Sequence, residues 1–352
     1  MKVLIIHPSF YTNGGAEKVI VRLANYLTEH HIPNTILTTE MCGEVRSQLF
    51  ETRLLLCKDF NEMSYVLQQI KNDFDVINIH NSPCELMSFG IKIPTVWCCN
   101  EPPEEWLRTK CLSRRQIEIV KKFIKKVIVA DQYNKERFEK IYEKFAEVIP
   151  YGIDHEFFKE GNAESFKNKY GLKDEFVISQ VGWVHPRKNQ ERTIEIFRMV
   201  KQKLPNAKLF LAGNQNYEYK KELDVYIKNY GLEDDVVFTG FISQEEVRDL
   251  IHASDVVLHP IRDQGGWLTV FDVMSAAKPV LVSDEATCSS LLKENELGWV
   301  CNNNLEFIKV ISEISEGKYK EVLLEDQKWV KENLSWKNYC DKMIESFKEV
   351  IE

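Results

Sequence analysis

The feature that most constrains the fold is an alternation of short runs rich in Val and Ile with longer amphipathic stretches. This alternation is typical of parallel strands joined by crossover helices. The predicted strands are residues 3–6, 35–38, 76–79, 95–98 and 126–129, then 177–181, 208–211, 236–239, 256–258 and 279–282. Two successive series predict an α/β protein with two doubly wound, Rossmann-like domains that face each other across a cleft. The turn Tyr151-Gly152-Ile153-Asp154 separates the series and is the predicted linker.

Composition excludes several classes of protein. The formal net charge of −8 argues against general nucleic-acid binding, which needs a basic surface. The nine cysteines are odd in number and lack Cys-x-x-Cys spacing, so we expect neither a disulfide framework nor a zinc knuckle. Scattered thiols fit a reducing compartment. The first residues lack the apolar stretch of a secretory signal, and no window of about 18 apolar residues occurs, so we expect a cytoplasmic protein.

Ligands of open α/β sheets bind beyond the carboxyl ends of the strands, so the loops at those ends carry the information on function. In the loop after residues 256–258, Gly265 and Gly266 precede a helix that is predicted to open near Thr269. Glycines allow close approach of the backbone, and free N–H groups at a helix start suit a diphosphate. Asp272, one turn into that helix, could accept two ribose hydroxyls. The alternative is an ordinary tight turn with a solvated Asp272.

Two other loops have similar features. Arg187 and Lys188 precede a helix in the loop after residues 177–181, where they favour a bound phosphate or else are solvated surface cations. Gly14 and Gly15 form a glycine loop after the first strand. That loop is not the G-x-G-x-x-G fingerprint of dinucleotide-binding proteins, which counts against a nicotinamide dehydrogenase. The triplet Asp73-Phe74-Asp75 is interpreted as a surface turn, and no metal ligands are predicted.

Taken together, these segments resemble the family 4 retaining glycosyltransferases (glycosyl transferases group 1), over nearly the whole chain. The matching stretches are Gly14-Gly15-Ala16-Glu17, Tyr151–Asp154, Gly182 to Lys188, Phe238–Ser243, and Gln264-x7-Asp272 followed by Val273–Pro279. The resemblance implies the GT-B fold. It implies an acceptor-side domain at residues 1–152, a nucleotide-sugar domain at 153–334, and a last helix at 335–352 that crosses back to the first domain.

The resemblance also implies an activity. A retaining hexosyltransferase of this kind would move a sugar from a UDP- or GDP-linked donor to a glycan or lipid-linked acceptor, in polysaccharide, glycolipid or glycoprotein assembly. No essential metal or other cofactor is implied. Lys188, with Arg187, would neutralise the donor diphosphate, and Asp272 would bind the ribose. The remaining residues implied in donor binding are Gly14, Gly15, Gln264, Gly265, Gly266, Trp267, Leu268 and Thr269. Trp267 has an alternative role as a core residue.

Four positions depart from the family pattern. Asn100 stands where the family has an active-site His, Trp183 where it has an Arg, and Gln264 and Asp272 where it has two Glu. We select Asn100, Lys188 and Gln264 as catalytic candidates. The departures also motivate a second hypothesis, a catalytically inactive GT-B relative that acts as a nucleotide-sugar-binding or scaffold subunit. A sugar-nucleotide epimerase is a third.

A basic segment, Arg108–Lys126, interleaves eight cations with apolar residues in the predicted acceptor-side domain. Such a segment could dock on anionic lipid at the inner face of the membrane, where a lipid-linked acceptor would lie. The alternative is a solvated helix face. His7 and His80 also follow predicted strands. His80 either contacts the acceptor or is a buried structural residue.

Overall fold

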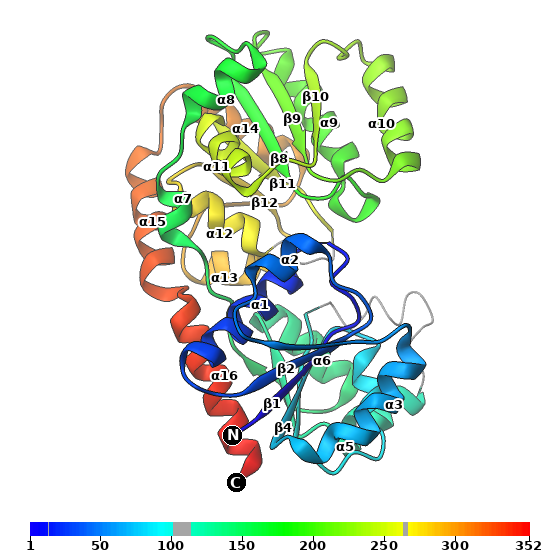
Figure 1. The fold of residues 1–352 in the computed structure, drawn as a ribbon. Helices are drawn as coiled ribbons and strands as arrows, with labels where there is room; N and C mark the ends of the chain where they lie inside the picture. Colours follow the sequence, from blue (N-terminus) through cyan, green and yellow to red (C-terminus); the bar gives the residue numbers. More distant parts are fainter. Residues whose placement is uncertain (13, 101–113, 263–266) are drawn as a thin grey trace. The chain divides into compact units, whose positions relative to one another are not determined.

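The structure, a computed structural model, describes residues 1–12, 14–100, 114–262 and 267–352. These residues form two compact units, one made of Met1–Gly152 with Trp336–Glu352 and the other of Ile153–Ser335. Each unit contains its own parallel sheet (Figure 1). The predicted fold class, two doubly wound α/β domains, is therefore confirmed, and every predicted strand is present.

The first unit contains a seven-stranded sheet of order β3-β2-β1-β4-β5-β6-β7, in which all pairs are parallel. Its strands are β1 (Val3–Ile6), β2 (Asn34–Thr38), β3 (Arg53–Leu56), β4 (Val76–His80), β5 (Thr95–Cys98), β6 (Lys126–Val129) and β7 (Glu147–Val148). The strand order changes direction between β1 and β4. A reversal of this kind opens a crevice at the carboxyl ends of the two strands, which is where such sheets bind ligands.

Helices cover both faces of this sheet. They are α1 (Gly15–Glu29), α2 (Gly43–Gln48), α3 (Phe60–Ile70), α5 (Arg114–Phe123), α6 (Gln132–Tyr142) and α16 (Trp336–Ile351), with 3₁₀ turns η1 (Lys71–Asp73) and η2 (Cys84–Ser88). Residues of α3, η2, α5 and α6 share one apolar core with the sheet. Asp59 and Asp131 cap α3 and α6 by accepting backbone N–H groups, which satisfies donors that a helix start leaves open.

The last helix, α16, packs on the first unit although it follows the second unit in the sequence (Figure 1). The Tyr26 hydroxyl of α1 donates to Asp341 Oδ1 at 2.6 Å, and Arg22 lies 5.9 Å above the Trp336 ring. Gly152 approaches the start of α16 so closely that a Cβ there would lie 2.4 Å from the Trp336 backbone. Close packing and direct hydrogen bonds therefore attach α16 to this unit.

The second unit contains a six-stranded parallel sheet of order β10-β9-β8-β11-β12-β13. Its strands are β8 (Val177–Val181), β9 (Lys208–Ala212), β10 (Val236–Gly240), β11 (Val256–His259), β12 (Val280–Ser283) and β13 (Trp299–Cys301). The helices are α7 (His155–Lys159), α8 (Ala163–Tyr170), α9 (Gln190–Lys201), α10 (Tyr217–Asn229), α11 (Gln244–Ala253), α12 (Trp267–Ser275), α13 (Ser289–Glu294), α14 (Asn304–Ser315) and α15 (Lys320–Asn333), with the 3₁₀ turn η3 (Pro186–Lys188). Two apolar clusters, one around Phe197 and one around Phe210, fill this unit.

Two searches of the described residues bear on the class of protein. No helix among them combines the length and the apolar character that crossing a bilayer requires. Within the same residues, no group of three or more His, Cys, Asp or Glu side chains gathers where a metal ion could bind.

Candidate functional site

The loop after β8 lies at the carboxyl edge of the second sheet and carries the predicted phosphate cations. It begins at Gly182, whose φ of +141° strains any residue with a side chain. Gly213 stands against it, because a Cβ on Gly213 would lie 2.3 Å from the Gly182 carbonyl oxygen. Gly182 is therefore required by its φ, and Gly213 by the close approach of the two loops.

Hydrogen bonds of polar side chains fix the far end of this loop. Gln180 Nε2 donates to the Lys188 carbonyl at 2.7 Å, and Thr193 Oγ1 in turn donates to Gln180 Oε1 at 2.6 Å. Asn189, at φ +56°, donates from Nδ2 to the Pro260 carbonyl at 2.9 Å and so joins the loop to the end of β11. Sequence reasoning missed Gln180, Thr193 and Asn189. A polar Gln180 within a buried strand was the available signal.

Lys188 lies at the centre of this edge. Its side chain is partly exposed but surrounded by protein on most sides, and burial, with a smaller contribution from the Arg187 charge, lowers the pKa of Lys188 to about 8. Its neighbour His259, at the end of β11, is buried, and burial, with a smaller contribution from Lys188, lowers the pKa of His259 to about 3. His259 is thus neutral, and the positive charge beside it is that of Lys188, which would attract an anion.

The helix α12 follows the second predicted loop and begins at Trp267, two residues before the predicted start at Thr269. Trp267 is 3% exposed, and its ring centroid lies 4.5 Å from that of Phe271, so it packs in the core of its unit. Asp272 is buried in the same helix, while Leu268 and Thr269 are partly exposed. Gln264, Gly265 and Gly266 lie outside the described residues.

The glycine loop of the first unit leads into α1. Gly14 occupies the N-cap position, and Glu17 folds back over it, because a Cβ on Gly14 would lie 2.6 Å from Glu17 Oε2. The other carboxylate oxygen of Glu17 lies 3.3 Å from His7 Nε2, at the end of β1. Gly15 is exposed. A contact between this loop and a ligand stays a prediction.

Asn100 follows β5 and belongs to a hydrogen-bonded group at the carboxyl ends of β4 and β5. The Tyr151 hydroxyl donates to Asn100 Oδ1 at 2.7 Å, and Asn100 Nδ2 donates to Asn81 Oδ1 at 2.8 Å. The same Nδ2 lies 3.5 Å from His80 Nδ1. His80 is completely buried, which agrees with the structural alternative for this residue. Sequence analysis missed Asn81 and treated Tyr151 only as part of the linker and of a stretch that matches the family.

The described part of the basic segment differs from the predicted amphipathic surface. Its apolar residues Ile119, Val120 and Ile124 are buried in the core of the first unit and are not available to a membrane. Lys121 and Lys126 form ion pairs with glutamates, at 2.5 Å to Glu143 and 2.6 Å to Glu147. The cations that remain exposed are Arg114, Arg115, Lys122 and Lys125. Residues 108–113 lie outside the described residues.

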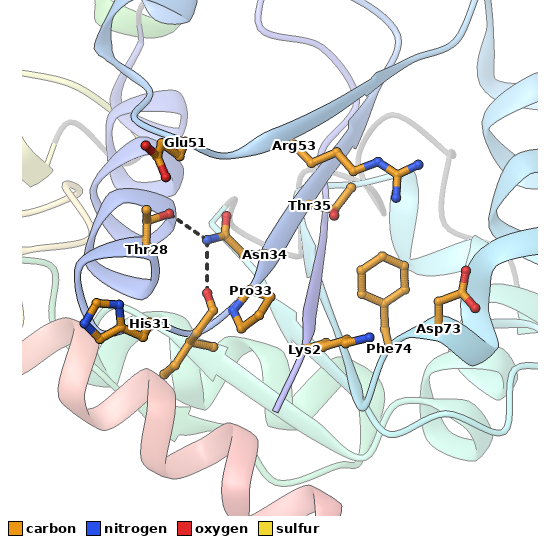
Figure 2. Close-up of a pocket in the computed structure, with 11 residues that line it drawn as sticks. Lys2, Thr28, His31, Pro33, Asn34, Thr35, Glu51, Arg53, Asp73 and Phe74 are labelled. Atoms are coloured by element: carbon orange, nitrogen blue, oxygen red, sulfur yellow. Dashed lines mark hydrogen bonds between the residues drawn. The ribbon is translucent and has the colours of Figure 1, made fainter.

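A cavity of about 590 Å³ in the first unit lies at the amino ends of the strands, opposite the predicted edge (Figure 2). Lys2, Arg53, Glu51 and Asp73 line it together with Asn34, whose Nδ2 donates to Thr28 Oγ1 and to the Ile32 carbonyl. The lining mixes both signs of charge and includes no residue predicted to act on a ligand. This cavity is therefore not the candidate site.

Models of two protein families match this chain. The model described as "Glycosyl transferases group 1" matches residues 162–337, half of the 352-residue chain. The model described as "Glycosyltransferase Family 4" matches residues 13–157. The two matches cover the two units that carry the loops described above.

Curated relatives match over parts of their length. Mannosylfructose-phosphate synthase of Agrobacterium fabrum is 26% identical over 40% of this chain and 33% of its own length. The putative glycosyltransferase YtcC of Bacillus subtilis is 22% identical over 66% of this chain and 61% of its own length. Lipopolysaccharide glucosyltransferase WaaG of Escherichia coli is 25% identical over 45% of this chain and 46% of its own length. In each case the match spans less than two thirds of the relative.

Solved structures match over the whole fold. The Anabaena protein Alr3699/HepE in complex with UDP and glucose has a TM-score of 0.84 at 19% identity and covers 99% of this chain and 100% of its own. WaaG, a glycosyltransferase involved in lipopolysaccharide biosynthesis, has a TM-score of 0.73 at 17% identity and covers 94% of this chain and 95% of its own. At these identities the likeness is one of fold.

Proposed function

Since the chain belongs to the glycosyl transferases group 1 family, we propose that it transfers a sugar from a nucleotide diphosphate sugar to an acceptor. The observation that carries this proposal is the loop at Lys188. Two glycines, the buried side chains of Gln180 and Thr193, and the partly buried side chain of Asn189 hold this loop, and its cation is largely withdrawn from water. A partly desolvated ammonium gains from a bound anion, so the loop suits a diphosphate.

The proposed donor site combines this loop with the start of α12. Lys188 and Arg187 neutralise the diphosphate, Asp272 accepts the ribose hydroxyls, and the backbone from Gly265 to Thr269 holds phosphate and sugar. Gln264 contacts the sugar. Support for a UDP-linked donor comes from the fold neighbour HepE, which was solved with UDP, with UDP and glucose, and with UDP-glucose. A GDP-linked donor fits the same diphosphate chemistry.

The proposed reaction breaks the bond between the anomeric carbon and the diphosphate, and the acceptor oxygen forms the new bond with retention of configuration. The proton of the acceptor hydroxyl passes to an oxygen of the departing phosphate. Negative charge develops on the departing β-phosphate. Lys188, Arg187 and the backbone N–H groups of the α12 start stabilise that charge, because cations and N–H donors aimed at a developing charge lower the barrier. The resemblance to retaining enzymes supports retention, and we propose that no essential metal takes part.

We propose that the acceptor is a glycan or a lipid-linked glycan, and that the protein binds peripherally to the membrane surface. One relative, WaaG, is named as a lipopolysaccharide glucosyltransferase. In this chain Phe89 is 55% exposed, Arg115 lies 5.8 Å above its ring, and the Phe123 ring lies 5.5 Å away beneath Lys122. An exposed ring beside a partly buried one, both among cations, suits the interface of an anionic bilayer.

Vesicle co-sedimentation tests the proposed membrane binding. The full chain should sediment with phosphatidylglycerol vesicles at low salt and stay in solution with phosphatidylcholine. Lys122→Glu/Lys125→Glu should abolish binding, while Lys228→Glu/Lys309→Glu, with the same change of net charge in the second unit, should not. Equal loss of vesicle binding in both double variants would show that only net charge matters. Absence of binding by the native chain would refute the proposed membrane binding.

A catalytically inactive, donor-binding subunit is the second candidate function. The observations that favour it are Asn100, whose amide is bonded to other side chains, and Trp183, which is 46% exposed where the family has an Arg. Slow hydrolysis of the donor separates the two candidates, because release of the sugar requires a working site. Conversion of the nucleotide sugar to an isomer would instead indicate an epimerase.

A thermal-shift panel of UDP, GDP, ADP and their sugar conjugates tests the donor site. A ligand at about 100 times its Kd stabilises by about 2.7 kcal/mol, which corresponds to a rise in Tm of roughly 5–10 °C for a domain of this size. Lys188→Ala should abolish the shift, and Lys203→Ala, an exposed lysine in the same unit, should retain it. No shift with any nucleotide would refute the donor-site assignment.

A further inference from the structure

The hydrogen-bonded group around Asn100 consists of neutral side chains. Asn78 and His80 belong to β4, while Asn100 follows β5 and Tyr151 follows β7. Asn78 and His80 are completely buried. Burial, with a smaller contribution from His7, lowers the pKa of His80 to about 3, and burial raises the pKa of Tyr151 well above its ordinary value. His80 is therefore an uncharged imidazole and Tyr151 keeps its proton throughout the neutral range.

The tautomer of His80 follows from its neighbour. Asn78 Nδ2 donates to the Val96 carbonyl at 3.3 Å, which fixes the orientation of the Asn78 amide. Its Oδ1 then lies 2.8 Å from His80 Nε2, so Nε2 must carry the proton and donate. His80 Nδ1 consequently has the lone pair. At 3.5 Å from Asn100 Nδ2, it is an acceptor for one Asn100 amide proton.

The remaining hydrogen-bonding capacity of Asn100 can now be counted. An amide has two N–H donors and two oxygen lone pairs. One N–H points to Asn81 Oδ1 and the other to His80 Nδ1, and one lone pair accepts the Tyr151 hydroxyl. Among the residues that the structure describes, none takes the second lone pair of Oδ1. Asn100 can therefore accept a hydrogen bond from a sugar hydroxyl but has no proton to donate to one.

The Tyr151 ring is itself fixed by the C-terminal helix. Its centroid lies 5.9 Å from that of Tyr339 in α16, and Tyr339 packs edge-on against Trp336 at 6.0 Å. The next residue, Gly152, touches the Trp336 backbone so closely that no Cβ fits. The start of α16 thus determines where the Tyr151 hydroxyl points.

We propose that Tyr151 and His80 are positioning residues that hold Asn100 as an acceptor for a sugar hydroxyl. The inference rests on the proposed transferase function, because it takes Asn100 to touch substrate. The proposal also gives a reason for a tyrosine at position 151, because its hydroxyl donates the hydrogen bond to Asn100 Oδ1.

The kinetics of the Tyr151→Phe variant test whether Tyr151 acts through Asn100. With whichever of UDP-glucose, UDP-galactose, UDP-N-acetylglucosamine and GDP-mannose the native chain hydrolyses, kcat/KM should fall roughly 3- to 10-fold, the usual effect of one lost neutral hydrogen bond. Affinity for the nucleotide diphosphate alone should not change, because it carries no sugar. In an Asn100→Ala background, Tyr151→Phe should cost nothing further.

A matched control is Tyr26→Phe, which removes a hydroxyl bond of similar length to Asp341 in the same unit. It should lower Tm without changing kcat/KM. Additive losses in the Asn100→Ala background would overturn the proposal, as would an equal kinetic loss in Tyr26→Phe. If Tyr151→Phe does not fold, Asn81→Gly removes the acceptor of Asn100 Nδ2 at a φ of +56° that glycine tolerates, and the same kinetic pattern is expected.

A second readout does not depend on activity. In protein labelled with ¹⁵N-asparagine, the Asn100 side-chain amide, assigned by its absence in Asn100→Asp, should exchange slowly and shift in Tyr151→Phe. An unchanged, rapidly exchanging Asn100 amide would overturn the positioning of this residue. Slow exchange together with no hydrolysis of any donor would leave the positioning in place and refute the transferase function instead.

Discussion

Replacement of Asp326 by Asn should stabilise the second unit at neutral pH. Asp326 in α15 is 2% exposed, and both carboxylate oxygens accept the backbone N–H of Gly298, at 3.2 and 3.3 Å. In the part of the chain that the structure describes, no cation pairs with this carboxylate. Burial raises the pKa of Asp326 from 3.8 to about 6, because one N–H does not replace the water that the charge has lost.

The magnitude follows from that pKa. A folded-state value near 6 against 3.8 in the unfolded chain corresponds to a cost of about 3 kcal/mol once both states are ionised. The folded state binds the proton more tightly, so the cost is absent well below pH 3.8 and complete above about pH 6. Asparagine removes the charge and keeps an oxygen for Gly298, but burial of its NH₂ costs about 1–2 kcal/mol. The expected net gain is therefore about 1–2 kcal/mol at about pH 7.5.

Urea unfolding of the wild-type and Asp326→Asn chains across a pH series is the assay. The advantage of the variant should stay nearly constant from about pH 7.5 to about pH 6 and then shrink as the pH falls to about 4.5. Glu325→Gln, the same change of group at the exposed neighbouring position, should alter stability by a few tenths of a kcal/mol at most. A variant effect that is the same at both ends of the series would refute the reasoning, because it would not arise from ionisation of Asp326.

Three further predictions concern other parts of the chain. Affinity for UDP, measured by calorimetry, should be constant between about pH 7 and pH 8, where the UDP phosphate keeps its full charge, and fall up to tenfold per pH unit above pH 8, because free Lys188 loses its proton there; a flat profile from pH 7 to pH 10 would contradict a role for its charge. Ser243→Ala should lower the unfolding free energy of the second unit by about 1 kcal/mol in urea melts, because it removes the capping box with Glu246; no loss would show that water replaces the cap. Gly152→Ala should cost about 1–3 kcal/mol and expose α16 to limited proteolysis, since its Cβ collides with Trp336; native-like resistance would mean that α16 shifts without cost.

The strands could be predicted where burial makes the sequence continuously apolar. β1 and β4 are buried along their whole length, and their Val- and Ile-rich runs stand out from the flanking segments. β3 was missed because its residues, Arg53–Leu56, are only partly buried at the edge of the sheet and include no β-branched residue. β7 has two residues, too few for any periodic pattern. Edge strands depend on pairing with a neighbour, which local sequence does not encode.

The candidate site could be predicted in outline only. The rule that ligands bind at the carboxyl ends of parallel strands selects the loop of Lys188 without knowledge of any contact. The partners of Asn100 could not be found in the same way, because Tyr151 lies 51 residues away and meets Asn100 only through the fold. Likewise Gln180 and Thr193 are separated by 13 residues, and only the packing of β8 on α9 brings them together.

The position of α16 has a consequence for the order in which a nascent chain can fold. The second unit, Ile153–Ser335, is one continuous segment, and its two ends are joined by a hydrogen bond of 3.0 Å from the Ile153 N–H to the Leu334 carbonyl. The first unit is split, and its final part leaves the ribosome after the whole second unit. Since domains generally fold as they emerge, the second unit should be complete first. Until α16 has been synthesised, the hydrophobic residues that it covers in the first unit, and the ring of Tyr151, stay exposed to solvent and to chaperones.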